Sequence, residues 1–143
     1  MPLRVVVVED EYRIAELLLQ LGHWEMLNLE VADVCYDGIH ALESIQNNKP
    51  DIVLTDIRMP FISGTALTRQ AKAVQPLLQV AFLSGYDDFE YAKAGIEDEI
   101  VAYLLKPISM AELTAELEKI HEKIVSRLAS LTKRRGPEER EIM

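Results

Sequence analysis

The chain has 143 residues and a formal net charge of -9, and 49% of its residues are hydrophobic. This length fits one domain with a sizeable core, and the composition is that of a folded chain rather than a disordered one. The negative charge argues against direct binding to nucleic acid, because phosphate binding needs a basic surface, so any contact with DNA would require another domain.

The single cysteine, Cys35, excludes an intrachain disulfide and a cysteine-based metal cluster. It lies in an apolar segment, where we expect a buried and unreactive thiol. The first residues, MPLRVVVVED, and every other apolar run are shorter than the roughly 20 residues that span a bilayer. We therefore expect a cytoplasmic protein that makes no membrane contact.

Short apolar runs and segments with helical spacing alternate along the chain. The runs are rich in Val, Ile and Leu and most lack polar alternation, which predicts strands covered on both faces of a parallel sheet, at residues 3–8, 31–35, 52–54, 80–83 and 101–105. The helical stripes between and after them are Ile14, Leu17, Leu18 and Leu21; Ile39, Leu42 and Ile45; Ala66, Leu67, Gln70, Ala71 and Val74; Phe89, Ala92, Lys93 and Ile96; and Leu113, Leu117, Ile120 and Ile124. Five strands and five helices in alternation predict a doubly wound (βα)5 α/β sandwich of three layers with right-handed crossovers.

Residues able to do chemistry follow four of the five predicted strands. In an open α/β sheet, ligands gather outside the carboxyl ends of the strands, near the point where strand order reverses. If the order is 2-1-3-4-5, the first and third strands are neighbours and their acids share one cleft. The residues at these strand ends are Glu9, Asp10 and Glu11 after the first, Asp56 at the third, Ser84 at the fourth and Lys106 at the fifth.

Carboxylates held together repel one another unless a cation lies between them. A site of oxygen ligands without His or Cys selects a hard ion, so Mg²⁺ is expected, with Mn²⁺ as the other candidate. Because Mg²⁺ often binds carboxylates together with phosphate oxygens, the cluster predicts a site for a phosphoryl group. Lys106 would supply positive charge, Ser84 a hydroxyl donor, and Asp56 the nucleophile that forms an aspartyl phosphate.

The motifs together resemble the response regulator receiver domain of two-component signalling. They are VVVVEDE, LTDIRMPFISG, FLSGYDDFEYA and YLLKP, and the resemblance covers about residues 3 to 121. It implies a flavodoxin-like, CheY-like fold and a phosphorylatable switch rather than an enzyme that acts on outside substrates. The segments GHWEMLNLEV and LSGYDDFEYAKAGI are similar to receivers that precede an AraC-type helix-turn-helix domain.

The resemblance also implies a role for each matching residue. Asp56 would accept phosphate from a sensor histidine kinase, while Glu9, Asp10, Asp56 and the backbone carbonyl of Arg58 would hold Mg²⁺. Lys106 would pair with the phosphoryl group, and the peptide bond between Lys106 and Pro107 would be cis. Ser84 and Tyr103 would be the switch residues that change the face formed by the fourth helix, fifth strand and fifth helix.

Two departures from the family pattern stand near these motifs. Glu9 replaces the commoner Asp of the acidic pair, which should keep metal binding with a longer side chain. Glu99 stands where most relatives have Gly before the fifth strand, at a surface turn used for dimerisation or output. Neither departure removes a required group.

Other interpretations of single residues remain open. Asp56 could stabilise the turn before Pro60, Glu11 could cap the first helix, Ser84 could cap the fourth helix, and Tyr103 could be a core ring. Two other functions also remain open: a receiver that only binds proteins, and a Mg²⁺-dependent phosphatase, although the chain lacks the DxDxT pattern of aspartate-nucleophile phosphatases.

The last apolar stripe continues past the predicted receiver domain, residues 1–121. Ile124, Leu128 and Leu131 extend it, so residues 122–143 are expected to form a helical extension followed by a solvated tail or linker. A projecting helix would expose its apolar side chains unless a second copy covered them. We therefore expect a homodimer through this helix or through the switch face, and regulation of transcription through an output domain outside this chain.

Overall fold

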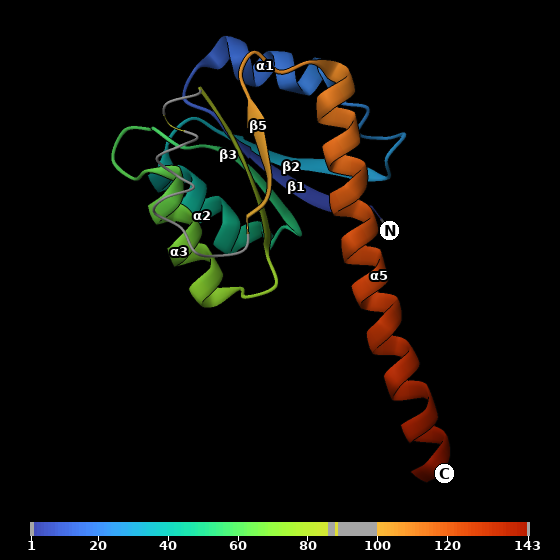
Figure 1. The fold of residues 1–143 in the computed structure, drawn as a ribbon. Coiled ribbons are helices and arrows are strands. Elements are labelled where there is room, and N and C mark those ends of the chain that lie inside the picture. Colours follow the sequence, from blue (N-terminus) through green and yellow to red (C-terminus); the bar gives the residue numbers. More distant parts are fainter. Residues whose placement is uncertain (1, 86–87, 89–99, 143) are drawn as a thin grey trace.

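The chain forms one parallel five-stranded sheet with helices on both faces (Figure 1). The computed structural model describes residues 2–85, 88 and 100–142. The strands are β1 (Leu3–Val8), β2 (Leu29–Cys35), β3 (Ile52–Asp56), β4 (Gln79–Ser84) and β5 (Ile100–Leu105), and the helices are α1 (Tyr12–Leu21), α2 (Gly38–Asn48), α3 (Gly64–Val74) and α5 (Met110–Ile142). The sheet order is β2-β1-β3-β4-β5, so the predicted flavodoxin-like topology is confirmed. Two features of the sequence lie outside the described residues. They are Glu99 and the predicted helix with the stripe Phe89, Ala92, Lys93 and Ile96.

Alternate residues of each central strand enter two separate cores, which explains the uninterrupted apolar runs. In β1, Val6 and Val8 pack with α2 and α3, while Val5 and Val7 pack with α1 and α5. Figure 1 shows the same arrangement, with α2 and α3 on one side of the sheet and α1 and α5 on the other. The three predicted layers are therefore α1/α5, the sheet, and α2/α3.

Four described members of the predicted helical stripes are exposed, namely Leu17, Ile39, Gln70 and Val74. Leu17 is 46% exposed, Ile39 50% and Val74 73%, so their assignment to buried faces was wrong. Small and polar side chains take buried places on α2 and α3 instead, including Ala41, Ser44 and Thr68. Such residues let a helix backbone approach the sheet closely. A prediction based on apolar residues alone does not identify them as buried.

The helix starts differ in how their free N–H groups are bonded. Ser109 accepts a hydrogen bond from the Glu112 N–H at 3.1 Å, as the capping pattern predicts for α5. Asp37 and Ser63 cap α2 and α3 in the same way. The expected cap by Glu11 is absent: Glu11 occupies the N-cap position of α1, but its side chain makes no capping bond.

Helix α5 runs from Met110 to Ile142 and extends beyond the sheet (Figure 1). It therefore includes the segment for which a tail or linker was expected. Its buried residues are Leu113, Leu117 and Ile120, and farther along Val125, Leu128 and Leu131 are exposed. Across the part of the chain that the structure describes, no helix has a stretch long and apolar enough to cross a membrane.

Cys35 lies at the end of β2 and is 5% exposed. Burial raises the pKa of its thiol from 9.0 to about 11. Because only the thiolate is reactive and a higher pKa leaves less thiolate, we expect alkylation by iodoacetamide at about pH 8 to be roughly 100-fold slower than for an ordinary thiol. Mass spectrometry of alkylated samples checks this. Unfolding in urea should restore fast labelling, and equal rates in both states would contradict the prediction.

Candidate functional site

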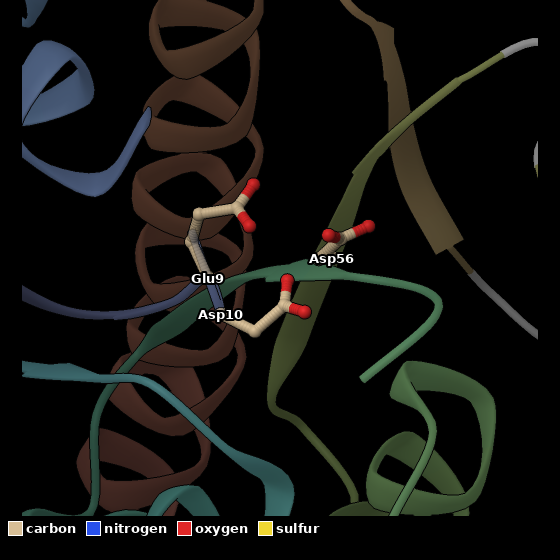
Figure 2. Close-up of side chains that lie close together, drawn as sticks. All are labelled: Glu9, Asp10 and Asp56. Carbon is tan, nitrogen blue, oxygen red and sulfur yellow. The ribbon is translucent and has the colours of Figure 1, made fainter. Parts of the chain in front are cut away.

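The register of β1 and β3 brings the predicted acids together. Val8 pairs with Thr55, so Glu9 and Asp56 follow neighbouring positions at the carboxyl ends of adjacent strands. Figure 2 shows the side chains of Glu9, Asp10 and Asp56 gathered at this edge. One carboxylate oxygen from each lies within 4.8 Å of the others, and Glu9 and Asp56 are buried while Asp10 is exposed.

Lys106 reaches the same cluster from the end of β5. Its Nζ atom lies 2.6 Å from Glu9 Oε1 and 3.1 Å from Asp56 Oδ2. Its backbone N–H donates to the Ser84 carbonyl at 2.9 Å, which fixes the end of β5 beside β4. The peptide bond between Lys106 and Pro107 is cis, as expected. One cation thus contacts acids from two different strands.

The environment of Glu9 is unusual for a carboxylate. Its side chain is fully buried, and burial raises its pKa to about 7, although Lys106 and the Glu11 N–H act in the opposite direction. Its Oε2 accepts a hydrogen bond from the Glu11 N–H, whereas Oε1 lies 2.6 Å from the ammonium nitrogen of Lys106. Burial also opposes the charge on Lys106, but its contacts with Glu9 and Asp56 outweigh this and raise its pKa.

These observations fit a divalent cation site. The three clustered residues offer carboxylate oxygens, which Mg²⁺ prefers as ligands. A cation here would offset the desolvation and repulsion that the cluster otherwise carries. Glu9, Asp10 and Asp56 are therefore the side chains that would hold it.

Asp56 is oriented by its own strand end. Its Oδ1 accepts a hydrogen bond from the Ile57 N–H at 2.7 Å, while Oδ2 faces Lys106. The two carboxylate oxygens of Asp56 thus have different partners, one on the backbone and one on the Lys106 ammonium group. Gly64, the last residue of the LTDIRMPFISG motif, lies against this strand end and donates its N–H to the Ile57 carbonyl at 2.6 Å.

Gly64→Ala should disturb this strand end. An added Cβ would lie 2.1 Å from the Asp56 carbonyl oxygen, so the backbone must shift. We expect a loss of about 1–3 kcal/mol in the free energy of unfolding, measured by urea denaturation. Gly85→Ala is the matched control, because a Cβ there meets no described residue within 4 Å and should change stability by less than about 0.5 kcal/mol. Equal stability of the two variants would contradict this packing argument.

Ser84 and Tyr103 lie beside the cluster without joining it. Ser84 is fully buried, and its hydroxyl donates to Asp88 Oδ2 at 3.2 Å. The Tyr103 ring is half-buried and packs edge-to-face on Phe82, with ring centroids 5.9 Å apart. Asp88 also forms an ion pair with the Arg58 side chain. Sequence reasoning missed Asp88, although an acid four residues after Ser84 was a signal that could have drawn attention to it.

Comparison with known proteins gives relatives of one kind. The chain is 37% identical to an uncharacterized response regulatory protein of Staphylococcus epidermidis over 124 residues, which cover 87% of this chain and 49% of that protein. It is 39% identical over 117 residues to the transcriptional regulatory protein HptR of Staphylococcus aureus, covering 82% of this chain and 46% of HptR. The chain thus spans about half the length of these curated relatives.

Solved structures agree with this result. The receiver domain of AraT, a response regulator from Geobacillus stearothermophilus, superposes with a TM-score of 0.86 at 30% identity, covering 90% of this chain and 99% of that one. The two-component transcriptional regulator AraC from Clostridium phytofermentans gives a TM-score of 0.83 at 32% identity, with 89% and 98% covered. The response regulator receiver domain family matches residues 5–118. The chain therefore belongs to the response regulator receiver domains of two-component signalling.

Proposed function

We propose that Asp56 accepts a phosphoryl group from a sensor histidine kinase and that this modification switches the chain between two states. The observation that carries the proposal is the placement of Lys106, whose Nζ atom contacts both Glu9 and Asp56 inside a cluster of three carboxylates. An acidic cluster with a fixed cation at its edge suits a dianionic group that arrives together with a metal ion.

In the proposed step, an Asp56 carboxylate oxygen bonds to phosphorus while the P–N bond of a phosphohistidine breaks. The imidazole nitrogen leaves with the electron pair of that bond. Lys106 would neutralise the phosphoryl oxygens, and bound Mg²⁺ would supply further charge stabilisation. Glu9, Asp10 and Asp56, with the Arg58 carbonyl, would hold the ion. In this proposal the chain promotes only its own phosphorylation and dephosphorylation.

A groove beside the acids supports a kinase as the partner. It has a volume of about 320 Å³, and it lies next to Lys106 between α1 and the connection from β5 to α5. Apolar side chains form nearly all of its lining: Ile14, Leu17, Leu18, Leu21, Pro107 and Ile108. Leu17, which the core does not use, would be available to a docking helix of the kinase.

Ser84 and Tyr103 would carry the change outward. Phosphorylation adds about -1.5 to -2 charge at Asp56, which attracts the Ser84 hydroxyl. Movement of Ser84 would leave space into which the Tyr103 ring could turn, changing the surface of β5 and α5. A shift between two packings is sufficient. The fourth helix of the expected switch face lies outside the described residues.

Regulation of transcription would require an output domain that binds DNA. The relative HptR is named a transcriptional regulatory protein, and this chain covers only 46% of it. We propose that the present chain reaches DNA only through such a domain, in the cytoplasm. Homodimerisation through α5 would cover its exposed side chains Val125, Leu128 and Leu131.

Intact mass spectrometry after incubation with acetyl phosphate tests the proposal. With Mg²⁺ the chain should gain one phosphoryl group, and chelation of Mg²⁺ by EDTA should prevent the gain. No gain with Mg²⁺ would contradict the proposal and favour a receiver that only binds proteins. Repeated turnover of a phosphoester such as p-nitrophenyl phosphate would favour the phosphatase instead.

A further inference from the structure

Asp88 contacts two groups that follow different strands of the sheet. Its Oδ2 accepts a hydrogen bond from the Ser84 hydroxyl at 3.2 Å, and its Oδ1 forms an ion pair with Arg58 Nε. Ser84 ends β4, whereas Arg58 lies two residues after Asp56 in the connection to α3. One side chain therefore ties together the segments that follow β3 and β4.

The burial of these groups differs and indicates what the contacts do. Ser84 is fully buried, so its hydroxyl has no access to water. The Asp88 side chain is 22% exposed and the Arg58 side chain 73%. Asp88 is thus the partner that satisfies a buried hydroxyl, and Arg58 balances the charge of Asp88 from the solvent side.

The hydrogen-bonding capacity of Ser84 makes two states mutually exclusive. A hydroxyl has one proton to donate, and both an ionised Asp88 and a phosphoryl oxygen can only accept. While Ser84 donates to Asp88, it cannot donate to a phosphoryl group on Asp56. Phosphorylation that recruits Ser84 must therefore break its bond to Asp88.

We propose that Asp88 is a positioning residue that, together with Arg58, holds Ser84 in the unphosphorylated arrangement and so opposes phosphorylation of Asp56. The inference rests on the proposed function and adds its regulation. By linkage, a contact present only in the unphosphorylated state lowers the population competent for phosphorylation. Removing the contact should raise that population.

The test compares initial rates of labelling by acetyl phosphate with Mg²⁺, read by intact mass. Asp88→Ala should be labelled about 3- to 10-fold faster than wild type, the range expected for the net loss of one hydrogen bond. Arg58→Gln and Asp88→Asn, which keeps an acceptor for Ser84, should give smaller increases. The double variant Asp88→Ala with Arg58→Gln should match Asp88→Ala alone, because Arg58 acts through Asp88.

A control separates this mechanism from a simple charge effect. Asp88→Ala removes one negative charge near an anionic donor, and Glu11→Gln removes one from an exposed acid at the same edge of the sheet. A charge effect alone would raise the labelling rates of Asp88→Ala and Glu11→Gln equally. It would act mainly by lowering the acetyl phosphate concentration that gives half of the maximal rate. The proposal predicts a higher maximal rate for Asp88→Ala and an unchanged maximal rate for Glu11→Gln.

Two results would overturn the inference while leaving the proposed function intact. They are labelling of Asp88→Ala at or below the wild-type rate, and full additivity of the two substitutions. A wild-type chain that is not labelled at all would overturn both. We expect each variant to keep the fold, because the side chains of Arg58 and Asp88 lie outside both hydrophobic cores. Circular dichroism of each variant checks this.

Discussion

Asp56→Asn should abolish phosphoryl labelling of the chain by acetyl phosphate. The substitution preserves the size of the side chain and an acceptor for the Ile57 N–H, which now bonds Asp56 Oδ1 at 2.7 Å. A carboxamide, however, lacks the anionic oxygen that attacks phosphorus. The amount of labelled protein in intact mass spectra should therefore fall to background while the thermal unfolding curve keeps its cooperative shape.

The same strand offers a matched control. Asp51 precedes β3 at its opposite end, where its Oδ2 accepts a hydrogen bond from the Arg4 N–H at 2.8 Å. Asp51→Asn keeps an acceptor there and lies far along the strand from the acidic cluster. It should be labelled like wild type. Label retained on Asp56→Asn, at the level of the control, would remove Asp56 from the proposed role.

Lys106→Met should slow labelling by about 10²–10³-fold, the usual effect of losing one preorganised group that stabilises developing negative charge. Methionine keeps much of the length and apolar volume of the side chain but removes the cation that faces Glu9 and Asp56. The initial rate at saturating acetyl phosphate and Mg²⁺ measures this effect. Loss of the buried partner should also lower the free energy of unfolding by about 1–3 kcal/mol.

Lys119→Met is the control for replacing a lysine by a methionine at a position away from the acidic cluster. Lys119 lies on α5 with its side chain 72% exposed and pairs with Glu116 on the same helix. A surface pair of this kind contributes little, so stability should change by less than about 0.5 kcal/mol and the rate of labelling should stay constant. Wild-type labelling of Lys106→Met would show that its contacts with the acids are structural only.

The fold was predictable because strand burial leaves a strong signal in the sequence. Four consecutive buried residues, Val5 to Val8, can occur in β1 only if helices cover both faces of the sheet. Helix faces were harder to predict, since the close packing of α2 uses Ala41 and Ser44 and leaves Ile39 exposed. Helix α5 continues to Ile142, through the residues for which a tail or linker was expected.

The site was predictable to the extent that it follows from strand ends. Glu9, Asp56 and Lys106 come together because parallel strands share one carboxyl edge. The interactions of side chains away from these ends could not be predicted in the same way. The contact of Asp88 with Arg58 depends on the course of two connections. The burial of Glu9, which raises its pKa, depends on the packing of the whole edge.

Locating the phosphoryl group tests the central claim most directly, namely that the acids around Asp56 share a divalent cation and that Asp56 is phosphorylated there. The chain is incubated with acetyl phosphate, with Mg²⁺ or with EDTA, and borohydride then reduces any aspartyl phosphate to homoserine, which peptide mass spectrometry locates. We predict homoserine in place of Asp56 alone, and only with Mg²⁺. Homoserine at another aspartate, or at Asp56 regardless of Mg²⁺, would contradict the account.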